Sequence, residues 1–470
     1  MMERLKKTGG VAAKKSADVK TSRFGIGFEK LDRNVFDPSK AYDKIAATGV
    51  KWVRIQSGWA RTETEKGVYH WEWIDDIIDN LYRRGLEVWV CLCYGNALYS
   101  EGADKVFGAV GIPPIFTDDE KHAWADYVSA FAERYAGKVT WFEVWNEPDG
   151  KWCWKHGPSG REYGQFVIDT SRAVKRGNPE AKIIGGSAWM REMVFLDEAF
   201  RAGMGDAVDA LTFHEYTADE SMVADRVSNL RALCDKYKPG IEIIQGESGS
   251  QSRSGGHGAL RSGSWTERKQ AKQLLRHAMA DMLADVKFSS YFSCMDMIEA
   301  LGGTVGDVSS YLDYGYFGVL GATFDENGFA IGEYAPKPSY YALCNVASVF
   351  AEDFRRAALP IRRCVEASSR VFGNDATLER DFIGGGFSRS DGSCAYVYWR
   401  STDLMTTDYD GTASFEIASE RLPRLIDLFD GSVYEIPENM IERKSEGVYE
   451  IKNLPLRDYP LVLVFGEFYK

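Results

Sequence analysis

The chain has 470 residues, more than a single ordinary hydrophobic core organises, so we expect one large domain and one smaller one. Its formal net charge of -12 at pH 7 argues against nucleic acid and anionic membranes as partners, because an acidic protein repels polyanions. The 13 Trp and 24 Tyr residues favour exposed aromatic surfaces for a neutral ring-shaped ligand such as a sugar.

The N-terminal segment is basic and polar, and we predict that residues 1–20 form a disordered tail. It contains no apolar stretch of the kind that secretory signals carry, and the rest of the chain has no run of about 18 apolar residues. We therefore expect a cytoplasmic protein that is not inserted in a membrane. The oligomeric state is left open by the sequence.

Residues 21–352 alternate short apolar runs with longer amphipathic stretches. Eight such rounds predict an α/β fold, a (β/α)8 barrel of parallel strands. The expected strands are residues 24–29, 52–57, 86–93, 139–146, 182–188, 210–216, 241–247 and 290–296.

Residues 353–470 lose the helical period and show short alternating runs such as "CAYVYWRS" and "GVYEIKNL", separated by Asp-Gly, Gly-Ser and Pro turns. This pattern predicts a C-terminal β-sandwich. We expect it to brace the barrel.

Two of the expected barrel strands deliver a carboxylate at their ends. The fourth reads "WFEVWNEP", in which Glu143, Trp145 and Glu147 are two apart and are expected to share the inward face. The seventh reads "IEIIQGE" and ends at Glu247. Since a barrel gathers the carboxyl ends of its strands at one mouth, Glu147 and Glu247 are expected to face each other across it.

Paired carboxylates that flank a cavity are what glycosidic bond cleavage requires. One carboxyl group protonates the leaving oxygen, and the other attacks the anomeric carbon or activates water. A separation of about 5 to 5.5 Å implies a retaining mechanism and a wider gap an inverting one, a distance that sequence does not provide.

Several motifs together resemble the clan A glycoside hydrolases, and most closely family 39, which includes β-xylosidases and iduronidases. The motifs are "WNEP" (145–148), "QGE" (245–247), "VRIQSGW" (53–59), "FHEYT" (213–217), "SYFSCMDMIE" (290–299) and "KPSYYAL" (337–343). The resemblance covers the barrel nearly end to end. It implies a retaining hydrolase of β-type glycosides with a carbohydrate substrate, no organic cofactor and no metal.

The resemblance also implies roles for individual residues. Glu147 would be the acid/base and Glu247 the nucleophile, kept ionised by Arg54 and the Tyr216 hydroxyl. Asn146 would hydrogen-bond the 2-hydroxyl of the sugar. Arg54 and Tyr216 are also candidate substrate-binding residues. For Arg54 the residues leave open a second reading, as the structural partner of a buried Glu143.

Further candidate substrate-binding residues surround this centre. His214 would bind substrate or orient Glu147. Phe292 stands where the family usually has a tryptophan that floors the −1 sugar subsite. Trp152 and Trp154, in the loop after the fourth strand, are candidates for stacking on the aglycone. The last candidates for contacts with sugar hydroxyls are Asp296 and Glu299, for which helix capping or solvent pairing is the alternative.

Two alternative functions stay open at this stage. One is an endo-glycosidase or a transglycosidase of the same clan, because the loops that would close one end of the cleft are not visible in the sequence. The other is a non-catalytic carbohydrate-binding barrel, against which the presence of Glu147, Glu247 and Asn146 together argues.

Overall fold

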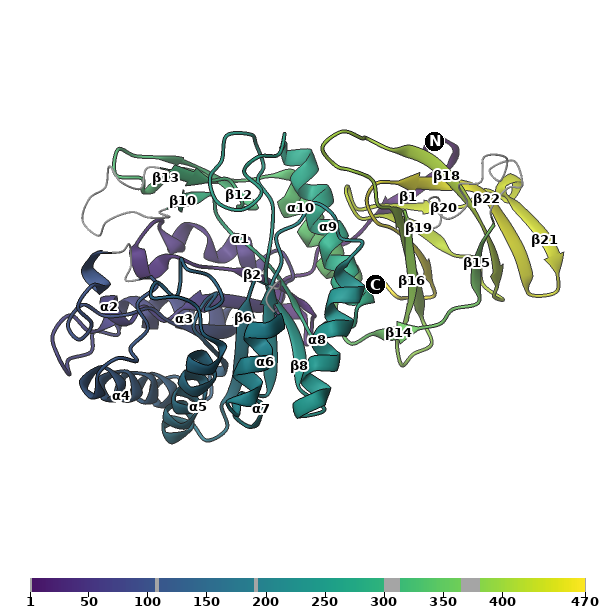
Figure 1. Cartoon of the computed structure of the whole chain (residues 1–470). Helices are drawn as coiled ribbons and strands as arrows, with labels where there is room; N and C mark the ends of the chain where they lie inside the picture. The colour runs from purple at the N-terminus through teal and green to yellow at the C-terminus, as the bar shows by residue number, and fades with distance from the viewer. Residues whose placement is uncertain (1, 106–109, 190–192, 300–312, 365–380, 470) are drawn as a thin grey trace.

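The computed structural model describes residues 2–105, 110–189, 193–299, 313–364 and 381–469. Eight parallel strands close into a barrel with helices around it, and a domain of antiparallel sheets lies beside the barrel (Figure 1). The predicted (β/α)8 barrel with a C-terminal β-sandwich is therefore confirmed.

The barrel strands follow one another in chain order, and the last pairs with the first. They are β2 (Phe24–Gly27), β3 (Trp52–Gln56), β4 (Glu87–Leu92), β5 (Val139–Val144), β6 (Lys182–Ala188), β7 (Ala210–His214), β8 (Glu242–Ser248) and β9 (Ser289–Tyr291). The last strand is shorter than residues 290–296, because the chain turns away after Tyr291. Two antiparallel strand pairs follow it: β10 (Met297–Glu299) with β11 (Asp313–Gly315), and β12 (Leu320–Phe324) with β13 (Ala330–Pro336).

The helices form where apolar residues recur at three- and four-residue intervals, as in the helix whose buried face is Ile74, Ile77, Ile78 and Leu81. Three long helices begin at a Thr or Ser whose hydroxyl accepts a backbone N–H of the first turn. The α-helices are α1 (Tyr42–Ala46), α2 (Trp59–Thr62), α3 (Glu72–Arg83), α4 (Asp118–Arg134), α5 (Gly160–Gly177), α6 (Met193–Arg201), α7 (Met204–Ala207), α8 (Val223–Tyr237), α9 (Glu267–Leu283) and α10 (Pro338–Val349).

The end of the barrel where its strands begin is filled by apolar side chains. Trp89, Ile184, Ala210, Ile244 and Phe288 form one buried cluster, on which Trp52 and Trp141 pack. The Trp89 indole N–H donates to Glu143 at 2.9 Å, so the charged part of the interior begins directly above this cluster. The barrel interior is thus packed with apolar side chains at one end of the strands and carries its charged site toward their carboxyl ends.

The C-terminal domain consists of a seven-stranded sheet, in the order β1-β20-β19-β23-β17-β16-β14, and a four-stranded sheet, β15-β18-β22-β21. Lys272 of α9 forms ion pairs with Asp408 and Asp458 of this domain, at 2.5 and 2.7 Å. The strands are β14 (Arg355–Ala357), β15 (Ile361–Cys364), β16 (Phe382–Ser388), β17 (Cys394–Arg400), β18 (Asp410–Ala418), β19 (Arg424–Asp427), β20 (Ser432–Glu435), β21 (Ile441–Ser445), β22 (Val448–Arg457) and β23 (Leu461–Phe465).

The N-terminal segment corrects one prediction. Residues 1–20 were expected to be a disordered tail, yet β1 (Lys6–Gly10) pairs antiparallel with β20 in the C-terminal domain, where purple β1 lies among yellow strands (Figure 1). The Lys6 ammonium lies 3.0 Å from the Glu435 carboxylate. The polar composition was misleading because the sheet edge that satisfies this backbone lies at the other end of the chain.

No helix in the described part of the chain combines the length and the apolar content that crossing a membrane requires.

Asp281 on α9 makes the stability of the barrel depend on pH. Its side chain is fully buried and accepts the Ser289 hydroxyl, and burial raises the pKa of Asp281 from 3.8 to about 7. The unfolded chain therefore releases this proton at lower pH than the folded one, so stability falls as pH rises from about 4 to about 7.

For Asp281→Asn we expect a higher free energy of unfolding at about pH 8, by a few kcal/mol at about 1.4 kcal/mol per pKa unit, and little change at about pH 4. Denaturant unfolding at both pH values measures this. The exposed Asp225 of α8 provides the control Asp225→Asn, expected to unfold like the wild type. Equal stability of Asp281→Asn and the wild type at about pH 8 would contradict the prediction.

Candidate active site

Glu147 lies just beyond the end of β5, where the backbone leaves the strand conformation. Trp145 and Glu147 both have positive φ angles, 65° and 43°, which residues other than glycine seldom adopt. The Trp145 indole consequently packs against Trp124 and Phe166 of the surrounding helices, and does not share the inward face with Glu143 as the strand pattern predicted. The same turn brings the Glu147 carboxylate to the mouth, with 14% of its side chain exposed.

Glu247 lies on β8, and its carboxylate is held by two donors. The Tyr216 hydroxyl donates to one oxygen at 2.6 Å, and the Arg54 guanidinium donates to the other. Burial favours the neutral acid, but the charges of His214 and Arg54 and the hydrogen bond from Tyr216 outweigh it, so the pKa of Glu247 lies below its usual value. Glu247 is an ionised carboxylate at neutral pH.

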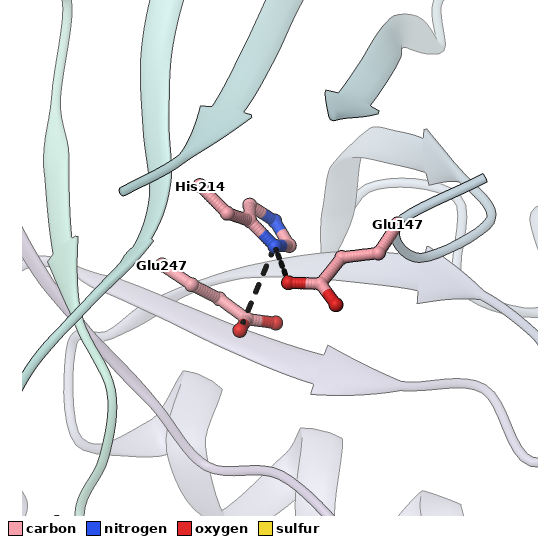
Figure 2. Close-up of side chains that lie close together, drawn as sticks. All are labelled: Glu147, His214 and Glu247. Carbon is pink, nitrogen blue, oxygen red and sulfur yellow. Dashed lines mark hydrogen bonds and ion pairs between the residues drawn. The ribbon is translucent and has the colours of Figure 1, made fainter. Parts of the chain in front are cut away.

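His214, at the end of β7, lies between the two carboxylates (Figure 2). Its Nδ1 is 3.0 Å from a Glu147 oxygen and 3.6 Å from a Glu247 oxygen. Burial opposes its charge, but Glu247, Glu143 and Glu147 together raise the pKa of His214 to about 10. The protonated ring therefore contacts both carboxyl groups, and one oxygen from each lies with the ring nitrogen within 4.8 Å of one another.

The same three side chains are spaced closely enough to hold a metal ion. Their hydrogen bonds argue for another use, because the His214 Nδ1 already pairs with Glu147 at 3.0 Å and the Tyr216 hydroxyl already donates to Glu247. The Arg54 guanidinium already neutralises Glu247. The donor set fits an organic substrate with hydroxyl groups better than a cation.

The Arg54 guanidinium binds several acidic residues of the site at once. It binds Glu143 through two hydrogen bonds of 2.7 and 3.0 Å, donates to the Asn146 amide oxygen at 2.8 Å, and lies 3.1 Å from Glu29. The expected contacts with Glu247 and Glu143 are both present. Because Arg54 is fully buried under these partners, its prediction as a substrate-binding residue is corrected to that of a residue that orients Glu247 and Asn146.

The structure separates the two candidate stacking tryptophans. Trp152 is 38% exposed, and its indole N–H donates to Glu147. Trp154 is fully buried and packs edge-on against Trp145 and Tyr163. The prediction that Trp154 stacks on the aglycone is therefore wrong, because the loop turns its ring toward the helices.

Three candidates from the end of the barrel have protein partners. Asp296 is buried in an ion pair with Lys337 at 2.6 Å, so its prediction as a sugar contact is corrected to a structural one. Glu299 pairs with Lys30 at 2.7 Å. Phe292 packs edge-on against Tyr216, at 6.2 Å between ring centroids, next to the site. Its role in the sugar subsite stays a prediction.

Two residues of the site were missed from the sequence. Glu29 follows β2, is 2% exposed and contacts Arg54. Its place at the end of the first expected strand, residues 24–29, was the signal available, as for Glu247 at the end of the seventh. Trp189 follows β6, is 37% exposed and lies 5.7 Å from Trp152, measured between ring centroids. No motif marks it.

Glu29 shares one guanidinium nitrogen of Arg54 with Glu247. Burial raises the pKa of Glu29 to about 7 against the opposing charge of Arg54, with Glu247 and His214 also facing it. Glu29 is thus protonated below about pH 7 and ionised above it. Once ionised, it competes with Glu247 for Arg54 and adds a second negative charge beside it.

We therefore expect activity in the wild type to fall a few-fold as pH rises through about 7, and this step to be absent in Glu29→Gln, which keeps the shape of the side chain. The pH profile of kcat/KM measures it. Glu87→Gln, at the exposed start of β4, is the control and should keep the wild-type profile. If kcat/KM of Glu29→Gln still falls as pH rises through about 7, the group that ionises there is not Glu29.

Comparison with known proteins shows which family part of the chain resembles. Residues 39–236 match the model of glycosyl hydrolases family 39. A family 39 glycoside hydrolase from the gut symbiont Bacteroides cellulosilyticus WH2 has a TM-score of 0.63 and 17% identity, over 94% of this chain and 81% of that one. A monomeric β-xylosidase from Caulobacter crescentus CB15 has a TM-score of 0.60 and 16% identity, over 97% of each chain.

A more distant neighbour is a family 30 endoxylanase from Clostridium papyrosolvens C71, with a TM-score of 0.56 and 11% identity, over 97% of each chain. At these identities the solved structures show a shared fold, the barrel with its β-sandwich. The sequence match lies within the barrel and includes Glu147 and His214. The chain is therefore a glycoside hydrolase that acts on a carbohydrate, and its residues 39–236 are similar to family 39.

Proposed function

We propose that the protein is a retaining hydrolase of β-linked glycosides, with Glu247 as nucleophile and Glu147 as acid/base. One observation carries this proposal: an oxygen of Glu147 and an oxygen of Glu247 lie within 4.8 Å of each other at the barrel mouth. Retaining enzymes hold their carboxyl groups about 5 to 5.5 Å apart, whereas inverting enzymes leave room for a water between them at about 6.5 to 9.5 Å.

In the first step, the Glu247 carboxylate attacks the anomeric carbon while Glu147 gives its proton to the glycosidic oxygen. The carbon–oxygen bond to the leaving group breaks, and a glycosyl ester on Glu247 forms. In the second step, Glu147 takes a proton from water, the water attacks the same carbon, and the ester breaks. Glu147 is then protonated and Glu247 ionised, as they were before the first step.

The surrounding residues support this division of roles. Arg54 and Tyr216 keep Glu247 ionised, as a nucleophile requires. Asn146 lies beside Glu147 and is oriented by Arg54, as a donor to the 2-hydroxyl needs to be. A non-catalytic binding barrel would have no use for a carboxylate held ionised by an arginine, a tyrosine and an imidazolium.

The test is hydrolysis of a panel of aryl glycosides (xyloside, glucoside, galactoside, arabinosides and glucuronide), with the anomeric configuration of the first product followed by NMR. We include xylosides because one structural neighbour is a β-xylosidase. Product formed with the substrate's configuration supports the proposal, and longer glycosides among the products indicate transglycosylation. Inverted product would overturn the retaining mechanism, and no turnover of any member would overturn the proposal.

A further inference from the structure

Two exposed tryptophans form a corner beside Glu147. Trp152 lies in the loop between β5 and α5, and Trp189 follows β6. They are 38% and 37% exposed, and their rings are nearly perpendicular, at 76° with centroids 5.7 Å apart. Two adjacent exposed indoles form a contiguous apolar surface, the kind of patch that marks a ligand-binding site.

The Trp152 ring and the backbone of Trp189 are held in place. The Trp152 ring lies so close on Gly150 that a Cβ added there would be 2.3 Å from the ring atom Cε2. Any residue larger than glycine would displace the indole. The backbone N–H of Trp189 donates to the Asp149 carboxylate at 3.0 Å, which ties the loop after β6 to the loop after β5. These contacts fix the shape of the tryptophan corner in the fold.

The orientation of the Glu147 carboxylate shows which part of a substrate this corner would meet. One oxygen, Oε1, faces His214 and Glu247, where the anomeric carbon would lie. The other, Oε2, accepts the indole N–H of Trp152. The leaving group has to lie beside Glu147, on the side away from the nucleophile, because its oxygen receives the Glu147 proton.

We propose that Trp152 and Trp189 form the leaving-group subsite, and that this subsite takes a cyclic leaving group with an apolar ring face, a sugar or an aryl alcohol. This rests on the acid/base role proposed for Glu147. The C–H face of a sugar and the face of an arene both pack on an indole, so their chemistry is shared. Trp152 has a second task as a positioning residue, since its N–H orients the carboxylate that delivers the proton.

The experiment compares glycosides of one sugar whose leaving group is methanol, phenol or a second sugar. For Trp189→Ala we expect kcat/KM to fall about tenfold with the phenyl glycoside, the disaccharide or both, a loss equivalent to about 1.4 kcal/mol, and to stay unchanged with the methyl glycoside. Loss with only one of the cyclic substrates identifies the preferred ring. Tyr82→Ala, which removes an exposed ring from α3, is the control.

For Trp152→Phe, which keeps a ring but removes the N–H, we expect kcat to fall more than KM rises, and most for the methyl glycoside, whose poor leaving group depends most on the proton. Equal losses across all three substrates in Trp189→Ala, or no loss in any, would overturn the inference.

A binding measurement separates this inference from the proposed function. Calorimetric titration with the sulfur-linked phenyl glycoside and with the sulfur-linked disaccharide reports the subsite without turnover. Weaker binding of at least one of them to Trp189→Ala supports the subsite even if no glycoside is hydrolysed, whereas unaltered binding of both overturns it. Thermal melting of each variant verifies that it is folded.

Discussion

Replacing Glu247 by alanine is expected to reduce hydrolysis by about 10⁴-fold or more, because no other group can form the bond to the anomeric carbon. The pocket itself should survive, since Arg54 retains Glu143, Asn146 and Glu29 as partners. A small anion such as azide fits the space that the carboxylate leaves. It should restore cleavage of aryl glycosides with good leaving groups and give the glycosyl azide of inverted configuration.

The measurement is the rate with and without azide, together with NMR of the product. Glu242 lies on the same strand with an exposed carboxylate paired to Lys287, so Glu242→Ala is a matched control that should keep wild-type activity and show no response to azide. Wild-type activity in Glu247→Ala would remove it as the nucleophile. A glycosyl azide with the configuration of the substrate would also rule out Glu247 as the nucleophile. Azide that takes the place of the missing nucleophile has to invert the anomeric carbon.

The position of the two main carboxylates was within reach of the sequence, and the reason is geometric. A parallel barrel places the ends of all its strands at one mouth, so residues 100 positions apart, such as Glu147 and Glu247, need no detailed model to be brought together. The positions of His214 and Tyr216 at the same mouth could be predicted for the same reason. Phe292 was harder, because β9 already ends at Tyr291.

What the sequence did not reveal depends on turns and on distant partners. Trp152 and Trp154 are two apart, but no strand or helix period governs the loop between them, and one points to solvent while the other is buried. Arg54 was expected to contact the substrate, yet it forms ion pairs with Glu29, Glu143 and Glu247. A single sequence does not show how many carboxylates will surround one arginine in the fold. The pairing of β1 with β20 joins the two ends of the chain.

Glu147→Ala should have an effect of a different kind, which depends on the leaving group. A glycoside whose leaving group is a poor acid, such as a methyl or sugar alcohol, should lose about 10³-fold or more, because general acid catalysis contributes about 10² to 10⁴ and the base of the second step is lost as well. A dinitrophenyl glycoside needs no proton to depart. Its first step should stay close to the wild-type rate, leaving the glycosyl ester on Glu247 to accumulate.

Azide separates the two roles most sharply. In Glu147→Ala it should attack the ester on Glu247 without needing a base, and the second inversion gives a glycosyl azide with the configuration of the substrate, opposite to the product from Glu247→Ala. Mass spectrometry of the intact protein detects the ester, and NMR assigns the azide. Glu180→Ala, at an exposed position before β6, is the control. Azides of the same configuration from both variants would mean that Glu147 and Glu247 do not divide the reaction as nucleophile and acid/base.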